Sequence, residues 1–268
     1  MDEGVGALIS YLKSSMKEKD MNICERLYDL SLEKAESVTV DKVSLGVGYT
    51  AVQTSDGGIG VSYTYFEKKT SCTVRADDVD FEQQPAALLL ERIKKEDPLE
   101  KGMALALVNS LNYRDALALP DDPRNDVLVR HFRIEKGRHV SMVGYFGPTI
   151  KLLEEKGAIV EVIDESRGIG ETDRFMDRLS AWTEVLILTS TSLLNNTAES
   201  ILERLGPDAR TLILGPSTPM IREAFEGLPV HMLAGIAPIP DENVFKVICH
   251  GLGTPALLKA CYKKYLLM

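Results

Sequence analysis

The sequence lacks paired cysteines, long apolar runs and a basic leader. Its four cysteines are scattered and form no C-x-x-C pair, which argues against a disulfide framework: Cys24, Cys72, Cys249 and Cys261. No segment approaches the roughly 20 apolar residues of a membrane span. The chain begins Met1-Asp-Glu-Gly, which is acidic where a signal peptide is basic. We therefore expect a cytoplasmic protein with no membrane partner.

Positive charge is also scarce. The sequence has 31 Lys and Arg and 40 Asp and Glu, which gives a net charge of -9 and a pI of about 5.1. Binding to nucleic acid depends on clustered basic residues, so we expect no nucleic-acid partner. The 268 residues are 44% hydrophobic, enough for one large or two modest domains. A homodimer is expected only because it is the commonest oligomer of soluble proteins.

The first 120 residues predict a small α+β domain. Apolar residues at helical spacing indicate two helices within residues 5–35 and two more over 84–95 and 98–118. Between them lie β-prone runs over 37–40, 43–47, 49–54 and 59–65, and Asp56-Gly-Gly between the last two is a hairpin turn signal. Tyr49 and Thr50 should therefore lie across from Tyr63 and Thr64.

Residues 121–268 predict a Rossmann-like α/β domain after a polar linker at Asp121–Asn125. Short apolar runs alternate with helical stretches, which is typical of a parallel sheet with helices on both faces. The strands that we expect are His139–Val143, Ile159–Ile163, Val185–Leu188, Thr211–Leu214, His231–Leu233 and Phe245–Ile248.

Two of these strands end in loops rich in glycine and proline, and these loops are the main functional signal. In open α/β sheets, ligands bind at the carboxyl ends of the strands. One loop is Gly144, Tyr145, Phe146, Gly147 and Pro148; the other is Gly215, Pro216, Ser217, Thr218 and Pro219. Ser217 lacks the G-x-S-x-G pattern of a serine nucleophile, so we expect its hydroxyl to contact a ligand or cap a helix.

A nucleotide site is one interpretation of the first loop. Asp164 follows Gly144 by 20 residues, the spacing at which a Rossmann acid meets a ribose hydroxyl. The loop lacks the G-x-G-x-x-G pattern, however, and Tyr145 and Phe146 put bulk where a dinucleotide needs space. An enzyme that uses a dinucleotide or S-adenosylmethionine is therefore an alternative.

Hydroxyl and amide groups gather after the third strand, from Thr189 to Thr197. Such groups can orient a polar ligand without carrying charge. The alternative is that Asn195 or Asn196 caps a following helix.

Metal-binding patterns are weak. The four histidines, His131, His139, His231 and His250, form no H-x-x-x-H or H-E-x-x-H pair. Cys249 and His250 follow an expected strand and could offer two donors, with Asp241 nearby in sequence. The alternative is an ordinary buried strand cysteine.

The chain resembles the DUF364 group, a prokaryotic family associated with heavy-metal chelation, preceded by its DUF4213 domain. The residues that carry the resemblance are Tyr49-Thr-Ala-Val, Gly58, Gly60, Tyr63-Thr64, Met142-Val-Gly-Tyr-Phe, Thr189, Asn195-Asn-Thr197 and Gly215-Pro-Ser-Thr-Pro. The resemblance implies an enolase-N-terminal-like α+β domain joined to a Rossmann-like α/β domain, with a site in the cleft between them. Likeness to the enolase N-terminal domain concerns the fold, and it does not imply enolase activity.

The sequence thus favours binding of a small polar or anionic ligand, or a metal or metal chelate, in an interdomain cleft. A non-catalytic scaffold module is a further alternative, and the sequence leaves open whether the protein is an enzyme. The expected ligand-binding residues are Tyr49, Thr50, Thr64, Gly144, Tyr145, Phe146, Asp164, Thr189, Asn195, Thr197, Gly215, Pro216, Ser217 and Thr218.

Overall fold

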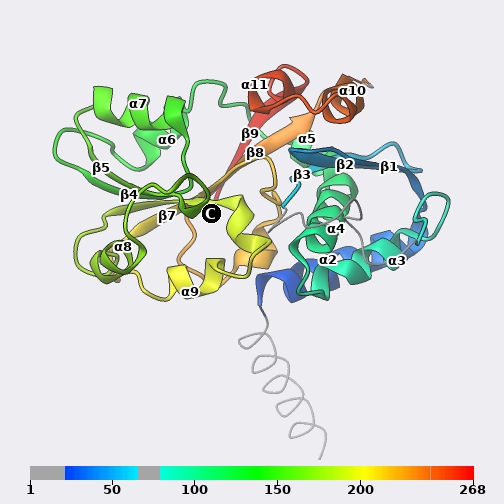
Figure 1. Ribbon diagram of the computed structural model, residues 1–268, viewed down its shortest axis with the longest axis horizontal. Helices are drawn as coiled ribbons and strands as arrows, with labels where there is room; N and C mark the ends of the chain where they lie inside the picture. The colour runs from blue at the N-terminus through cyan, green and yellow to red at the C-terminus, as the bar shows by residue number, and fades with distance from the viewer. Residues whose placement is uncertain (1–21, 66–78, 242) are drawn as a thin grey trace, which may run out of the picture.

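A small antiparallel sheet and a larger, mostly parallel sheet lie side by side in the protein (Figure 1). The computed structural model describes residues 22–65, 79–241 and 243–268. The first helix expected within residues 5–35 lies mainly outside these described residues. No helix in the described part of the chain is both long enough and apolar enough to cross a membrane.

The small sheet is the meander predicted from the sequence. It consists of β1 (Val40–Leu45), β2 (Tyr49–Thr54) and β3 (Ile59–Tyr63), in the order β1-β2-β3. Tyr49 pairs with Tyr63 across the hairpin, as expected. One strand, β1, stands in place of the two β-prone runs over 37–40 and 43–47: it begins only at Val40, because Ser37 still belongs to helix α2 (Ile23–Ser37).

Helices cover one face of the small sheet. They are α2 (Ile23–Ser37), α3 (Ala86–Leu90), the 3-10 helix η1 (Glu91–Lys94) and α4 (Pro98–Leu111), whereas the following helix α5 (Tyr113–Ala118) packs against the last two strands of the large sheet. Asn22 and Glu25 form a capping box at the start of α2, and Asp97 caps α4, whose first residue is a proline. Nearly every residue of α4 is buried, because α4 lies between the sheet and the other helices.

The large sheet has the strand order β5-β4-β6-β7-β8-β9. Neighbouring strands are parallel except for β9, which runs antiparallel to β8. The strands are β4 (His139–Val143), β5 (Ile159–Ile163), β6 (Val185–Thr189), β7 (Arg210–Leu214), β8 (Met232–Pro238) and β9 (Cys261–Leu267). The first five occupy the predicted runs, although β8 extends further than expected.

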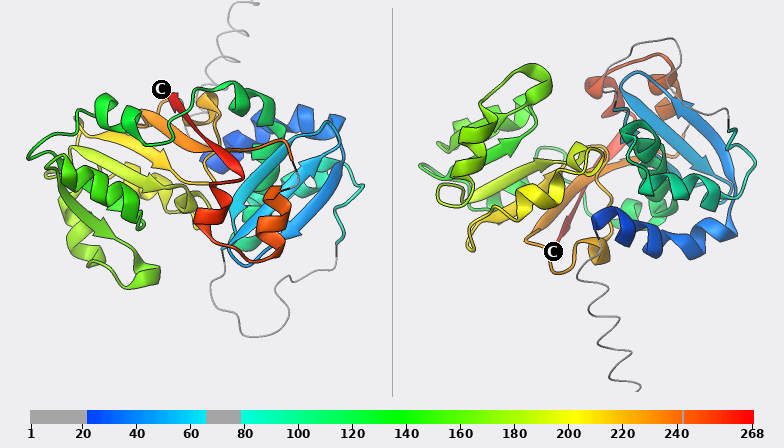
Figure 2. Two further views of the ribbon diagram at one scale, coloured as in Figure 1. Left: turned by 90° about the horizontal axis from the view of Figure 1, so that it is seen from above. Right: turned by 60° about the horizontal axis from the view of Figure 1, so that its bottom comes forward.

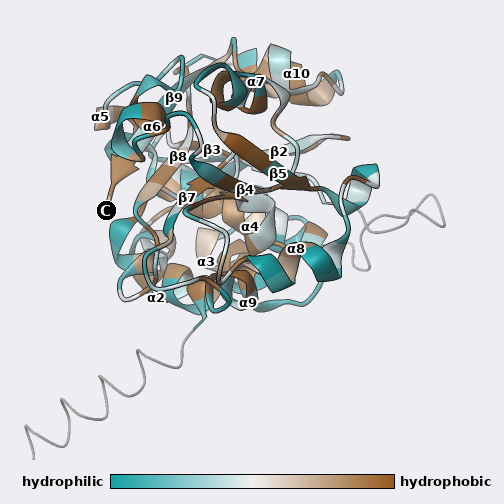
Figure 3. Ribbon diagram, turned by 90° about the vertical axis from the view of Figure 1, so that its left-hand side faces the viewer, coloured by the Kyte–Doolittle hydropathy of each residue, from teal (hydrophilic) through white to brown (hydrophobic). Residues whose placement is uncertain are grey.

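Helices pack on both faces of the large sheet, as predicted. On one face lie α6 (Asp126–His131) and α7 (Gly147–Glu155), whose apolar residues join a core with β4 and β6. The other face is covered by α8 (Thr172–Arg178) and α9 (Ala198–Leu202), with the short 3-10 helices η2 (Glu165–Arg167), η3 (Ser190–Leu193) and η4 (Arg222–Phe225) in the connections. Figure 3 shows the hydrophobic strands of this sheet between helices whose outer sides are hydrophilic.

The end of the chain differs from the prediction. The run Phe245–Ile248, expected as a strand, belongs to helix α10 (Asn243–Cys249), and the sixth strand is instead β9. Val244, Phe245 and Ile248 are buried against the small sheet. Helices α10 and α11 (Thr254–Leu257) thus lie over β1–β3, on the face opposite α4 (Figure 2). A four-residue apolar run has no resolvable period, so helix and strand could not be distinguished there.

The two sheets share a core and a polar junction. One hydrophobic cluster contains Leu27 and Leu107 from the first part of the chain and Leu186 and Phe225 from the second. The Tyr113 hydroxyl donates to the Pro238 carbonyl at 3.0 Å across the junction.

Candidate functional site

The strand order of the large sheet reverses between β4 and β6. From β4 the chain moves outward to β5, then returns to the other side of β4 as β6. In open α/β sheets, ligands bind outside the carboxyl ends of the strands at such a switch point. The loops that begin at Gly144 and Thr189 flank this point, because they follow β4 and β6.

Gly144 and Thr189 are packed tightly together. Gly144 has φ +88°, a region that favours glycine, and a Cβ at this position would lie 2.9 Å from the Thr189 Cβ. The Thr189 hydroxyl is hydrogen bonded to the Thr191 hydroxyl at 2.9 Å. Thr189 itself is half-buried. The structure therefore brings the Gly144 loop and the hydroxyl-rich segment that begins at Thr189 to one place.

Asp164 organises the Gly144 loop from the end of β5. Its carboxylate accepts from the Tyr145 N–H at 3.0 Å, the Ser166 hydroxyl at 2.6 Å and the Arg167 N–H at 3.2 Å. The Arg167 guanidinium lies 3.5 Å from the carboxylate and 5.1 Å from the centre of the Tyr145 ring. Both carboxylate oxygens thus accept hydrogen bonds from nearby loop residues, and the expected bond to a ligand hydroxyl stays a prediction.

Ser217 joins the Gly215 loop, which follows β7, to the small sheet. Its side chain is fully buried, and its Oγ accepts from the Tyr63 N–H at 2.8 Å and the Ser62 hydroxyl at 3.2 Å. The Asn109 amide reaches the Val61 carbonyl at 2.9 Å and the Ser217 carbonyl at 3.4 Å. The structure gives Ser217 the role of a connector between the two sheets, where the sequence led us to expect a ligand contact or a helix cap.

Other predicted hydroxyl groups are also buried within the protein. Thr50 and Thr64 are hydrogen bonded to each other at 2.9 Å, and Thr218 donates to the Gly215 carbonyl at 2.8 Å. Next to Thr218, the space lined by β3, α4, α5 and β8 measures only about 10 Å³. This part of the junction is filled, and Gly215 itself is buried next to Ser190.

Aromatic rings remain exposed where the two sheets meet the loops. Tyr145 is exposed, and Phe146 and Pro216 are partly exposed. On the small sheet, the rings of Tyr49, Tyr63 and Tyr65 follow one another edge to face, with centroid separations of 6.0 and 6.4 Å. The Tyr49 hydroxyl is engaged by Thr254 at 2.6 Å, whereas Tyr63 is exposed.

Asn195 and Thr197 lie on the surface, in the loop before α9. The Thr197 hydroxyl donates to the Asn195 side chain at 2.8 Å. Helix α9 begins without a side-chain cap, so the expectation that Asn195 or Asn196 caps it is wrong. Asn196 instead contacts Glu96 and Lys101, near the start of α4.

The metal candidates do not converge. Cys249 and His250 lie at the end of helix α10, and both are exposed, so neither the expected strand end nor the buried strand cysteine is observed. Asp241 accepts from the Asn243 N–H at 3.0 Å and from the Asn243 side-chain amide at 2.7 Å. Across the described residues, no three His, Cys, Asp or Glu side chains are grouped as a metal site.

Sequence reasoning missed Arg167 and Asn109. Arg167 follows Asp164 by three residues, a spacing at which a turn brings an ion pair together, so its role was visible in principle. Asn109 lies inside an apolar helix, and its partner Ser217 is 108 residues away, so no local pattern indicates the contact.

Comparison with known proteins agrees with this architecture. A solved structure of a DUF364 protein of unknown function from Pyrococcus horikoshii has a TM-score of 0.74 at 19% identity, covering 92% of this chain and 100% of that one. A second, from Desulfitobacterium hafniense, has a TM-score of 0.69 at 19% identity, covering 90% and 97%. An uncharacterised protein of Methanocaldococcus jannaschii, MJ0500, is 23% identical over 256 residues, 91% of this chain and 95% of that protein.

Family models describe almost the whole chain. The DUF4213 model matches residues 28–112 and the DUF364 model matches residues 126–267, and both carry the description "putative heavy-metal chelation". The second match alone spans more than half of the sequence, so the chain belongs to the DUF364 family.

Proposed function

We propose that the protein binds a small, oxygen-rich organic anion at the carboxyl edge of the large sheet, above the β4–β6 switch point. The observation that carries this proposal is the close packing of the Gly144 and Thr189 loops at that point. A ligand there would lie between the Tyr145 loop and the exposed end of β3.

The accessible groups suit such a ligand. Tyr145 offers a ring with an adjacent hydroxyl, and the half-buried hydroxyls of Thr189 and Thr191 offer uncharged hydrogen bonds. Helix α7 begins at Gly147 with no side-chain cap, so the positive end of its dipole faces this edge. Arg167 adds a cation beside Tyr145.

A bare metal ion fits these residues poorly. Of the predicted carboxyl-edge site residues, only Asp164 carries a carboxylate, and its oxygens already accept hydrogen bonds from nearby loop residues. Hydroxyl and backbone groups alone are weak ligands for soft transition metals. We infer that any heavy metal arrives as cargo, already held by the organic anion, and that the protein recognises the complex.

Isothermal titration calorimetry with 2,3-dihydroxybenzoate, alone and as its ferric complex, tests the proposal. We expect saturable binding that Tyr145→Ala weakens about tenfold, because a lost ring contact costs about 1.4 kcal/mol. Thr189→Val removes the hydroxyl at similar volume and should also weaken binding.

Tyr262→Ala is the matched control. Tyr262 on β9 is 42% exposed, against 43% for Tyr145, and each ring has one cationic side chain over it. This variant should bind as the wild type does. Absence of binding by both probes, or unchanged affinity in both Tyr145→Ala and Thr189→Val, would refute the proposal.

The cysteines support a cytoplasmic location as part of the proposal. Cys24 and Cys261 are buried and free, and burial raises the pKa of their thiols to about 11 and about 12. Free buried thiols are common in reducing compartments. Cys72 lies outside the described residues.

A further inference from the structure

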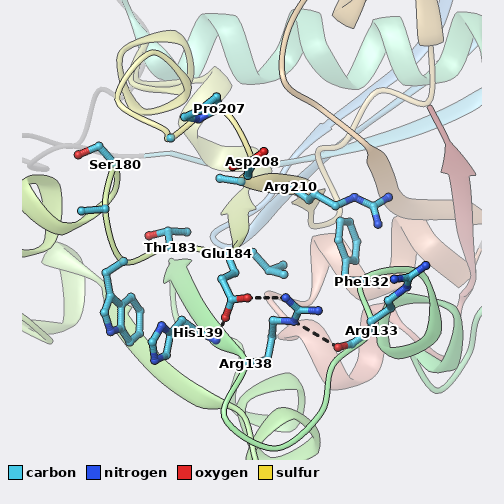
Figure 4. A pocket seen from close by; sticks show the side chains of 15 residues that line it. Phe132, Arg133, Arg138, His139, Ser180, Thr183, Glu184, Pro207, Asp208 and Arg210 are labelled. Atoms are coloured by element: carbon cyan, nitrogen blue, oxygen red, sulfur yellow. Dashed lines mark hydrogen bonds and ion pairs between the residues drawn. The ribbon is translucent and has the colours of Figure 1, made fainter.

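A cavity of about 610 Å³ opens at the opposite edge of the large sheet, at the amino ends of β4, β6 and β7 (Figure 4). Three segments line it: residues 132–139, 180–185 and 206–210. A cavity of this volume is large enough for a small-molecule ligand. Because it lies at the amino ends of the strands, it is separate from the site proposed above.

Three arginines line this cavity, and two of them have no carboxylate partner among the described residues. Arg138 is paired with Glu184, which also accepts from the His139 N–H at 2.9 Å. Arg210 instead donates to the His131 carbonyl at 2.9 Å and contacts the His131 Nε2 at 2.7 Å. Arg133 is exposed, and its side chain forms no hydrogen bond or ion pair with the described part of the chain.

The partners of Arg210 leave its charge uncompensated. The His131 carbonyl is neutral, and burial together with the Arg210 charge lowers the pKa of the His131 imidazole, which favours its neutral form. Asp208, the other acid in the lining, forms no salt bridge with described residues. Two guanidinium groups without an ion pair among the described residues therefore border one cavity, and with the Asp208 carboxylate in the same lining they leave one net positive charge there.

The opposite side of the cavity is aromatic. Trp182 stacks on His139 with ring centroids 4.5 Å apart and planes 13° apart, and Arg178 lies 4.4 Å from the centre of the Trp182 ring. Figure 4 shows Arg133 and Arg210 beside Phe132 on one side and His139 on the other, with Glu184 and Arg138 between them. The Arg210 guanidinium packs 5.1 Å from the centre of the Phe132 ring, which limits its motion.

We propose that this cavity binds a small molecule that bears a phosphoryl group, held by Arg133, Arg138 and Arg210. The planar fork of an arginine donates two parallel hydrogen bonds to a phosphate, and a multiply charged oxyanion matches guanidinium groups that have no ion pair among the described residues. The wall formed by Trp182 and His139 would contact the remainder of the molecule. The proposal is independent of the ligand at the carboxyl edge.

Trp182 provides a direct readout, because it is the only tryptophan of the chain. Inorganic pyrophosphate is titrated into the full-length protein, with Trp182 fluorescence and calorimetry measured in parallel. We expect a saturable change in both signals. Arg133→Gln should weaken binding about tenfold, the loss of one charge-assisted hydrogen bond, and should leave folding intact because the side chain is exposed.

Arg174→Gln is the matched control. Arg174 is an exposed arginine on α8 outside the cavity lining, so its removal changes net charge equally and should not change pyrophosphate affinity. Tyr145→Ala should also bind pyrophosphate normally, which separates this proposal from the first. Citrate is titrated as a carboxylate anion for comparison with pyrophosphate. Sodium chloride is titrated to the same ionic strength as a control for nonspecific salt effects.

Four results would overturn the assignment. They are no saturable heat at millimolar pyrophosphate, equal affinity in Arg133→Gln and the wild type, a fluorescence change that chloride reproduces, and binding of citrate without binding of pyrophosphate. Each titration is measured on protein whose folding has been verified by circular dichroism.

Discussion

Ser217 shows how a single hydroxyl can connect two sheets. Its Oγ accepts from the backbone N–H of Tyr63, so replacing it leaves a donor at the junction without its partner. Buried polar groups that lose their partner cost about 1–3 kcal/mol. Because the other predicted Ser and Thr hydroxyls at the junction are buried as well, the accessible hydroxyls of the proposed site are those of Tyr145, Thr189 and Thr191.

We therefore expect Ser217→Ala to lower the free energy of unfolding by about 1–3 kcal/mol in urea denaturation. Ser200→Ala is the control, because Ser200 is exposed and its hydroxyl donates only to the Thr197 carbonyl in the same turn. Equal stability of Ser217→Ala and the wild type would show that the bond to Tyr63 contributes little.

The histidines beside Arg210 should make stability depend on pH. Burial and the Arg210 charge lower the pKa of both His131 and His231 below the ordinary value of 6.5. The unfolded chain therefore binds more protons than the folded chain as pH falls through about 6.5, and folding loses stability there.

Urea denaturation between about pH 7.5 and 5.5 should show this loss in the wild type. His131→Gln keeps an acceptor for Arg210 without the titration, so its stability should fall less over the same range. His250→Gln, at an exposed position, should follow the wild type. A profile for His131→Gln that matches the wild type would contradict the argument.

At the scale of elements, β3 packs against α4 with no space for a side chain at Gly60. A Cβ there would lie 2.1 Å from the Ala106 carbonyl oxygen and 2.2 Å from the Ser110 nitrogen, both in the helix backbone. Backbone atoms of a buried helix cannot move aside cheaply. Gly60 therefore fixes the distance between the hairpin and α4.

Gly60→Ala should destabilise the protein by several kcal/mol, on the order of the largest single-residue effects, or prevent folding. Gly48→Ala is the matched control: it lies in the same meander, and a Cβ there meets no atom within 4 Å. Thermal unfolding measures both. A melting temperature for Gly60→Ala equal to that of Gly48→Ala would show that the close approach is absent in solution.

The predictability of the elements depended on local pattern. The hairpin was clear because Asp56-Gly-Gly separates two alternating runs, and β4 and β5 were clear because glycine or a polar residue ends each apolar run. Strand β9 was missed because Tyr262, Lys263 and Lys264 interrupt its apolar pattern, and its pairing with β8 supplies the remaining stability.

At the scale of the whole molecule, the two sheets are not independent. Helices α10 and α11 come from the end of the chain yet pack on the small sheet, and one core cluster draws residues from both parts. The boundary expected between residues 120 and 121 stays a prediction. The convergence of the loops followed from the parallel order of strands, whereas the burial of Ser217 depended on a contact 154 residues away.

We expect cooperative unfolding from this shared core. Differential scanning calorimetry should show one transition, with a ratio of calorimetric to van't Hoff enthalpy of about 1. Two resolved transitions would mean that the sheets unfold separately and that the junction contributes little to stability.

A crystal structure of the protein with 2,3-dihydroxybenzoate tests the central claim most directly. The account predicts electron density for the ligand above the β4–β6 switch point, in contact with the Tyr145 ring and the Thr189 hydroxyl. Density for the ligand elsewhere, with none beside Tyr145 and Thr189, would contradict it.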